Sequence, residues 1–194
     1  MNFLLPDPIP THIAGAGFWF EVLQPHHVKL DFDAVMESKE FLRRWSNSSW
    51  PEDEFRLEDN LRDLEWHFEE FKELTAFTYT ILNHSKTRCW GCIYIRPVES
   101  IQSLTQNDLI KLQPYQFFVS YWVIPEIRNT PMETQIFTTL LDWLLTKWQF
   151  PSVLFASNRQ IPEQNKLYQN NKMALYLEIE ANIRYQLFWT PHKG

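Results

Sequence analysis

The hydrophobic and polar positions of the chain form their clearest pattern between Phe117 and Trp148. Residues Phe117 to Ile124 are aromatic, β-branched or small and carry no charge, which is typical of a strand covered on both faces. After Pro125 the apolar positions take up helical spacing and predict a helix of about four turns. These positions are Met132, Ile136, Phe137, Leu140, Leu141, Leu144, Leu145 and Trp148.

The start of this helix is specified by local chemistry. Thr130 is a good N-cap, Pro131 suits the first helical position, and Glu133 completes a Thr-x-x-Glu capping box. A helix that begins at the carboxyl end of a buried strand offers free N–H groups and a positive dipole end. The junction is therefore a natural site for an anion.

The remaining pattern predicts an α/β protein with a mixed sheet, in the order β-α-α-β-β-β-α-β-α-β-β. A helix runs from Asp31 or Asp33 to about Trp45, and an acidic helix follows it. The crossover through the Met132–Trp148 helix should make its two flanking strands parallel. We expect an irregular arm over residues 1–12 and one domain over 13–194. The other predicted strands are 17–23, 76–83, 88–96, 152–156, 175–180 and 183–189, with helical segments near 107–112 and after Pro162.

Composition and charge narrow the function classes. The chain has 194 residues and a net charge of -6, so a nucleic-acid-binding surface is not expected. Its four glycines are not spaced as in Walker or dinucleotide-binding loops. Residues 52–73 hold ten acidic and three basic residues, a local charge of -7, which leaves +1 for the rest. A solvated helix face is the simpler interpretation, and an acidic rim that attracts an amine or basic peptide is the alternative.

The two cysteines, Cys89 and Cys92, lie within a strand pattern. An odd separation on a regular strand places the two thiols on opposite faces, so we expect buried structural thiols. The neighbouring His26 and His27 point apart, and we expect no metal. No basic residue precedes Lys29, so we expect neither a signal peptide nor a membrane span, and a reducing cytoplasmic location.

The run VIPEIRNTPMET, from Val123 to Thr134, resembles the strand, pyrophosphate loop and helix start of the GNAT superfamily of N-acetyltransferases. That pattern is V-x-P-x-x-[QR]-x-x-G-x-[GA], and Val123, Pro125 and Arg128 match it in type and spacing. The predicted element order resembles the same fold from about Phe18 to Trp189. Gly91 and Tyr168 also stand where many members have a glycine and a tyrosine.

The resemblance implies attack of an amine on the thioester of acetyl-CoA, with an amine-bearing small molecule or peptide as acceptor. It implies that strand backbone holds the pantetheine arm and that the following loop holds the diphosphate. Tyr168 would give a proton to the leaving thiolate, and Glu21, Glu126 or a water would be the general base. The implied cofactor-binding residues are Tyr121, Trp122, Val123, Arg128, Asn129, Thr130, Met132, Glu133 and Thr134.

Pro131 and Glu133 depart from the pattern, because they stand where the family has two small residues. Proline removes an N–H donor and glutamate adds a negative charge, which we expect to cost about 1 to 3 kcal/mol of acetyl-CoA affinity. One hypothesis is an N-acetyltransferase with weakened cofactor binding. The other is a non-catalytic GNAT-fold binding or scaffolding protein, and an α/β domain that shares only the element order is a weaker third. The acceptor and a homodimeric state stay open.

Overall fold

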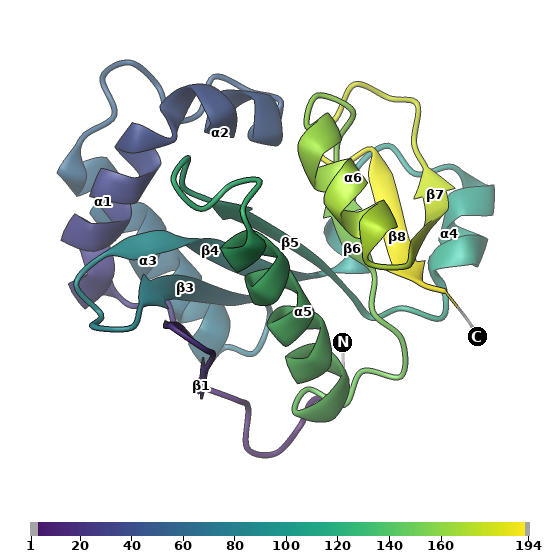
Figure 1. Cartoon of the computed structure of the whole chain (residues 1–194). Coiled ribbons are helices and arrows are strands. Elements are labelled where there is room, and N and C mark those ends of the chain that lie inside the picture. The colour runs from purple at the N-terminus through teal and green to yellow at the C-terminus, as the bar shows by residue number, and fades with distance from the viewer. Residues whose placement is uncertain (1–3, 193–194) are drawn as a thin grey trace.

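The computed structural model describes residues 4–192, and an eight-stranded sheet runs through this part of the chain (Figure 1). The strand order is β1-β2-β3-β4-β5-β6-β8-β7. Only the β5·β6 pair is parallel among the strand pairs of the described residues, as the crossover predicted. The strands are β1 His12–Ala14, β2 Phe18–Val22, β3 Phe77–Asn83, β4 Cys89–Pro97, β5 Phe117–Val123, β6 Phe155–Ser157, β7 Met173–Glu178 and β8 Leu187–Pro191.

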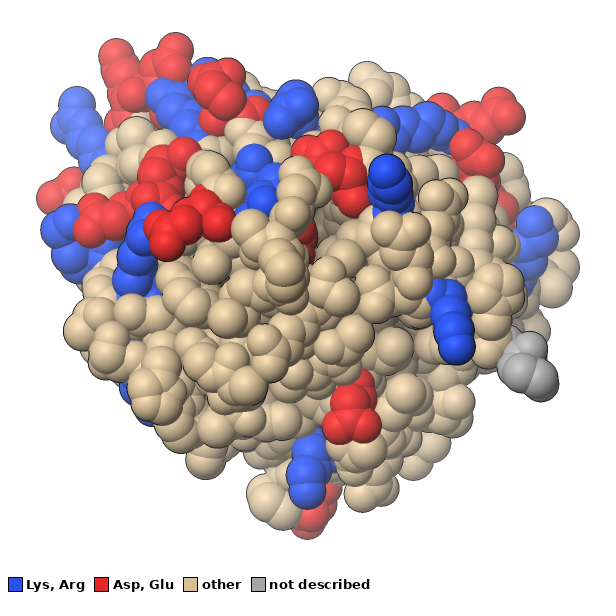
Figure 2. All heavy atoms as spheres, viewed as in Figure 1, with Lys and Arg blue, Asp and Glu red and all other residues tan. Residues whose placement is uncertain are grey.

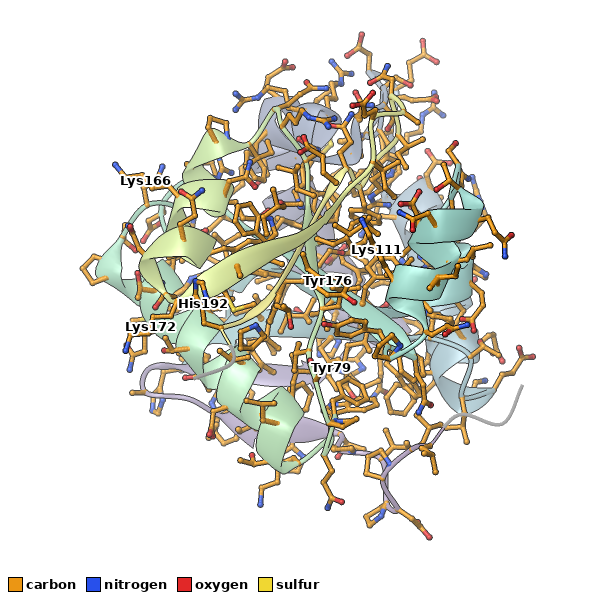
Figure 3. All side chains as sticks on the ribbon, turned by 90° about the vertical axis from the view of Figure 1, so that its right-hand side faces the viewer. Tyr79, Lys111, Lys166, Lys172, Tyr176 and His192 are labelled. Carbon is orange, nitrogen blue, oxygen red and sulfur yellow. The ribbon has the colours of Figure 1, made fainter. Side chains whose placement is uncertain are left out.

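Helices cover both faces of the sheet (Figure 1). In that view α5 and α6 lie in front of β5 and β6, while α1 and α3 lie on the other side. The α4 helix lies beside β7, and the Tyr176 hydroxyl donates to the Lys111 carbonyl at 2.7 Å (Figure 3). The helices are α1 Val28–Glu37, α2 Lys39–Ser46, α3 Leu57–Lys72, α4 Gln106–Leu112, α5 Pro131–Thr146 and α6 Pro162–Asn170.

The core on the α5 face is mainly aromatic. Trp143 and Trp148 of α5 and the turn after it pack edge-on against Tyr79 of β3, with ring centroids 4.9 and 6.3 Å from it. The Tyr79 hydroxyl donates to the Pro10 carbonyl at 2.6 Å, and Figure 3 shows this residue deep in the molecule. Edge-to-face packing stabilises such clusters beyond simple burial. The cluster holds α5 against the sheet and so fixes where the helix begins.

One predicted helix and two predicted strands are wrong in their bounds, and one strand was not predicted. The helix expected from Asp31 or Asp33 to Trp45 is two helices that meet at Ser38, and both aspartates lie inside α1. The pattern did not predict β1, which pairs with β2 from His12 onward. The last two strands are 173–178 and 187–191 and are joined by a longer segment than expected. Apolar periodicity continued across the break at Ser38 and through the segment before β8, so it did not mark those boundaries.

The predicted placement of the two thiols on opposite faces is also wrong. Ile81 pairs with Gly91 and Leu82 pairs with Cys89, so Trp90 is an extra residue in β4. Such a β-bulge reverses the alternation of side chains on one side of it. Gly91 has a φ of +143°, and a Cβ there would lie 1.9 Å from the Trp122 carbonyl oxygen. Only glycine fits this close approach, and Cys89 turns to the face of Cys92.

Asp31 completes a buried polar cluster with the two thiols. The Cys92 thiol donates to Asp31 Oδ1 at 3.1 Å and Asn60 Nδ2 donates to Oδ2 at 3.0 Å. One ligand atom each from Asp31, Cys89 and Cys92 lies within 4.8 Å of the other two. Burial raises the pKa of the Asp31 carboxyl, against the effect of its two donors. The cluster ties α1 to β4 and α3 through hydrogen bonds.

The surface in the view of Figure 2 is unevenly charged. Basic and acidic side chains gather together over α1 and α2, while the surface over β1 and much of α5 is mainly uncharged. None of the helices in residues 4–192 combines the length and the apolar character that a membrane span requires.

Candidate active site

The N-cap and the first helical residue of α5 are those that the sequence predicted. Thr130 is the N-cap, its Oγ1 accepts from Glu133 N at 3.4 Å, and Pro131 is the first helical residue. Asn129 has a φ of +60°, which turns the chain from β5 into the helix. The helix therefore begins directly above the carboxyl end of β5, where a helix start favours negative charge.

Glu133 places its own carboxylate at this helix start. The side chain is 5% exposed, and its Oε2 accepts a hydrogen bond from Asn129 N at 2.6 Å. The predicted capping box is therefore wrong in one arm, because Thr130 N donates to the Ile127 carbonyl instead. Burial raises the pKa of Glu133, while Asn129 N–H and the Arg128 charge lower it. The anion that this helix start attracts is a residue of the chain itself.

Arg128 points beneath the loop. Its guanidinium stacks 3.5 Å from the ring centroid of Phe41 on α2, and Nη2 donates to the Val123 carbonyl at 3.1 Å. Its Nε is buried without a hydrogen-bond partner among the described residues. Burial lowers the pKa of this side chain. In this structure Arg128 braces the end of β5 against α2 and does not line the groove described below.

Strands β5 and β6 part soon after they meet. Their single ladder pair is Val119 with Phe155, and Val119 N donates to the Leu154 carbonyl at 2.7 Å. We call the opening beyond this pair the wedge. Gln164 Nε2 from α6 donates to the Tyr121 carbonyl there at 2.9 Å. The Tyr121 carbonyl, which lies beyond the β5·β6 pairing, is thus bonded by a side chain of α6.

Trp122 and Val123, the other two strand residues predicted to hold the pantetheine arm, pair along β4. Trp122 lies opposite Cys92 and Val123 opposite Gly91. The Trp122 indole donates to the Tyr94 hydroxyl at 3.3 Å. Their backbone groups lie at the same strand end as the wedge.

Tyr168 of α6 lies beside the wedge and is fully buried. Its ring centroid is 5.2 Å from that of Phe137 and 6.4 Å from that of Tyr121. Its hydroxyl has no hydrogen-bond partner among the described residues, and neither do the Tyr121 hydroxyl and Gln164 Oε1. Burial first, and then the charges of Glu133 and Tyr185, raise the pKa of Tyr168 well above its ordinary value. Tyr168, Tyr121 and Gln164 thus each have a buried polar atom without a hydrogen-bond partner among the described residues, which favours a ligand at this position.

A groove of about 760 Å³ lies between the start of α5 and α6. Asn129, Thr130, Glu133 and Thr134, which the family resemblance implies as cofactor-binding residues, line one side of it. Met132 lies outside this lining and is half-buried against the core. Lys166, on the other side, was not predicted, because the sparse apolar pattern of its helix gave no indication of which residues face the loop. Among residues 4–192 it is the only basic residue of the lining, and Figure 3 shows it at the outer edge of α6.

The two candidate bases are already engaged in ion pairs. Glu21 on β2 pairs with Lys86 and lies 3.8 Å from His27 Nε2. Glu126, in the loop after β5, is exposed and pairs with Arg88. Neither lines the groove. The structure thus brings Tyr168 and the loop residues together without bringing either glutamate to them.

Solved structures of acetyltransferases resemble this architecture over most of the chain. The ribosomal-protein-S5-alanine acetyltransferase from Vibrio fischeri has a TM-score of 0.69 at 12% identity, over 93% of this chain and 96% of that one. An acetyltransferase of Salmonella typhimurium that modifies the N-terminal serine of L7/L12 has a TM-score of 0.67 at 10% identity, over 94% and 99%. This chain has the GNAT fold. No family model and no curated protein sequence matches it.

The RimL acetyltransferase of ribosomal L7/L12, solved in complex with coenzyme A, shares the GNAT fold with this chain at a TM-score of 0.68 and 12% identity, over 92% of this chain and 95% of that one. The residues of this chain fit such a cofactor unequally. The wedge of the GNAT fold offers partnerless polar atoms that an amide-rich arm would satisfy. At the helix start Glu133 and Pro131 oppose a diphosphate.

Proposed function

We propose that this chain is an N-acetyltransferase that uses an acyl-CoA thioester to acylate an amine, with weakened affinity for acetyl-CoA. The observation that carries the proposal is the Tyr168 hydroxyl, which is buried beside the wedge without a partner. The GNAT-fold neighbours described as acetyltransferases of ribosomal proteins support it, as does the one solved with coenzyme A. An amine-bearing small molecule or peptide as acceptor, a cytoplasmic location and a homodimeric state stay predictions.

Tyr168 is suited to act as a general acid. When bound, the cofactor supplies an activated thioester, whose thiolate needs a proton on leaving. The phenol is protonated at neutral pH and so holds a proton that it could donate, although burial raises its pKa and makes it a weaker acid toward the thiolate. Its burial also keeps water from competing for the same proton. Glu21 and Glu126 are held by Lys86 and Arg88, so we infer that the attacking amine loses its proton to water.

The chain's own groups set the affinity for the cofactor. The Tyr121 carbonyl is the acceptor available to a ligand amide in the wedge, and Gln164 must release it first. At the helix start the Glu133 charge repels a diphosphate, as does Glu163 of α6, while Lys166 attracts it across the groove. We expect Asn129, Thr130 and Thr134 to contact the diphosphate from the loop side. Together these charges should make cofactor binding weaker than at a helix start that carries no glutamate.

The alternative is a non-catalytic binding protein. Two contacts favour it specifically: Glu133 bonded to Asn129 N, and Gln164 bonded to the Tyr121 carbonyl. Each uses a backbone group that acyl-CoA would need. In this alternative the GNAT fold is kept as a scaffold, and cofactor is not bound.

Calorimetric titration with acetyl-CoA separates the two functions. The proposal predicts binding in the range of tens to hundreds of micromolar, and slow release of free thiol when amines are added. No heat at millimolar acetyl-CoA from folded protein would refute the acetyltransferase and leave the binding protein. A matched titration of Tyr168→Phe should show binding no tighter than that of the wild type, and reduced thiol release.

A further inference from the structure

A second cavity lies on the opposite face of the sheet from the groove and is rich in arginine. It has a volume of about 260 Å³. Phe118 of β5 and Tyr185 form its apolar side, and Arg96 and Arg184 supply its charge. None of the described residues that line it is acidic. We call it the arginine pocket.

Arg184 is held in place by aromatic rings. Its guanidinium carbon lies 4.2 Å from the ring centroid of Trp45, 5.0 Å from that of Tyr185 and 5.8 Å from that of Tyr94. Stacking contacts the faces of a guanidinium and leaves its N–H donors free at the edge. The rings thus orient Arg184 without consuming its hydrogen-bonding capacity.

The charge of Arg184 has no counter-ion in the described part of the chain. None of the ion pairs or hydrogen bonds within residues 4–192 involves its guanidinium, and its Nε is buried without a partner. Arg96 differs, because its Nη2 donates to Glu70 at 2.9 Å. Glu70 therefore offsets one of the two charges from outside the pocket. A buried donor on an unpaired cation needs an anionic acceptor to offset its desolvation.

The pocket reaches the strand that forms the wedge. The Tyr185 hydroxyl lies 3.0 Å from Ser120 Oγ. Ser120 follows Val119, the last β5 residue paired with β6. The same hydroxyl contributes to raising the pKa of Tyr168, whose ring packs on the other face. A molecule in the arginine pocket would therefore lie across the sheet from Tyr168, next to the opening between the strands.

We propose that the arginine pocket binds an anionic group of the acceptor, so that the substrate is an amine with a carboxylate a few bonds from its nitrogen. Arg184 holds the carboxylate and the apolar side of Phe118 and Tyr185 contacts the carbon chain between the two groups. The volume suits an amino acid or one acidic residue at a peptide end. This inference deepens the proposed function and rests on it for the role of the bound amine. The acidic helix had favoured a basic acceptor, but Glu70 of that helix pairs with Arg96 instead.

Binding is measured without acetyl-CoA, by calorimetry, so that the result does not depend on catalysis. The free acids are glycine, β-alanine and 4-aminobutyrate, each compared with its carboxamide. A tripeptide amide that begins with Asp, compared with the same peptide beginning with Asn, tests a peptide end as the source of the carboxylate. We expect at least one acid to bind on the order of tenfold more tightly than its neutral partner.

Two variants assign this preference to the pocket. Arg184→Met keeps a long side chain over Trp45 and removes the charge, so the preference for the acid should vanish. Arg159→Met is the control, since it also removes a positive charge, but from a side chain that pairs with Glu178 and does not line the pocket. Thermal unfolding verifies that both variants are folded. Arg184→Lys should keep part of the preference, because a single ammonium replaces the planar pair of donors.

Equal binding of acids and amides by the folded wild type, including no binding of either, would overturn the proposal. If Arg159→Met lost the preference for the acid as fully as Arg184→Met, the proposal would also be overturned, because the preference would then depend on overall charge. If the acids bind as expected but acetyl-CoA does not, the proposed acetyltransferase fails while the pocket stands. If acetyl-CoA binds and no acid is preferred, the pocket assignment fails while the proposed cofactor binding stands.

Discussion

Replacing Glu133 by glutamine tests whether this side chain controls anion binding at the start of α5. The glutamate is 5% exposed and accepts from Asn129 N at 2.6 Å. Glutamine has nearly the same shape and keeps an oxygen for that bond, so the helix start should keep its form. The substitution removes the negative charge alone.

The size of the effect follows from Coulomb's law. A unit charge about 6 Å from a phosphate oxygen costs roughly 3 kcal/mol at an effective dielectric constant of about 20. The groove is open to solvent, and screening reduces this to about 1 to 2 kcal/mol. The affinity of Glu133→Gln for coenzyme A should therefore be about five- to thirtyfold higher than that of the wild type.

Calorimetric titration with coenzyme A measures this change, and Asp142→Asn is the matched control. Asp142 lies near the other end of α5, is exposed, and loses the same charge on substitution. Pro131→Gly combined with Glu133→Gly also restores the missing N–H donor and should bind more tightly still. The reasoning is refuted if Glu133→Gln and wild type have the same dissociation constant, or if Asp142→Asn gains as much.

Glu133→Gln should also change the pH dependence of stability. Because burial raises the pKa of Glu133, the folded state holds its proton more tightly than the unfolded state. The stability that this proton gives is present below the unfolded value of about 4.5 and is lost as pH rises through the folded pKa. The free energy of unfolding, measured with urea between pH 4 and 8, should fall less with rising pH in the variant than in the wild type. If it fell equally in both, Glu133 would not be the group responsible.

Four other substitutions test separate features. Lys166→Gln should weaken coenzyme A binding about threefold to tenfold in low salt and less at high salt, measured by titration at two ionic strengths. Tyr168→Phe should lower thiol release about tenfold to a hundredfold with unchanged stability, because the lost hydroxyl has no partner; equal rates would exclude it as the acid. Gly91→Ala should destabilise the fold by about 3 kcal/mol or more, since its Cβ would meet the Trp122 carbonyl, as urea unfolding would show. Burial lowers the pKa of His27 from 6.5 to about 4, so the free energy of unfolding falls as pH drops from 6.5 to 4. His27→Gln should remove about 2 kcal/mol of that fall. If the variant lost as much stability as the wild type between pH 6.5 and 4, His27 would not be its cause.

The sequence predicted elements whose signals are local. Thr130 and Pro131 start α5 because capping and fixed φ act within a few residues. The parallel pair of β5 and β6 also followed, since a crossover helix leaves little choice of direction. These elements carry the wedge and the loop, so the sequence predicted the part of the fold in which the candidate site lies.

Contacts between distant segments could not be predicted in this way. Arg184 meets Trp45 across the fold, and no spacing in the chain indicates their stacking. Lys166 faces the loop only because α6 packs in one orientation. The break at Ser38 interrupts a helical pattern that continues in sequence, and tertiary packing decides it.

The extra residue in β4 has a consequence for the comparison of related sequences. Trp90 shifts the alternation of side chains in the strand by one residue. Cys89 and Cys92 therefore lie on the same face, whereas in a regular strand without the bulge they would lie on opposite faces. Arg88, the residue before Cys89, forms ion pairs with both Glu37 of α1 and Glu126 in the loop after β5. A relative with one residue fewer here would lose the thiol pair and this cross-brace together. An alignment should therefore place its gap at Trp90, and the length of the hairpin would then identify chains that keep both features.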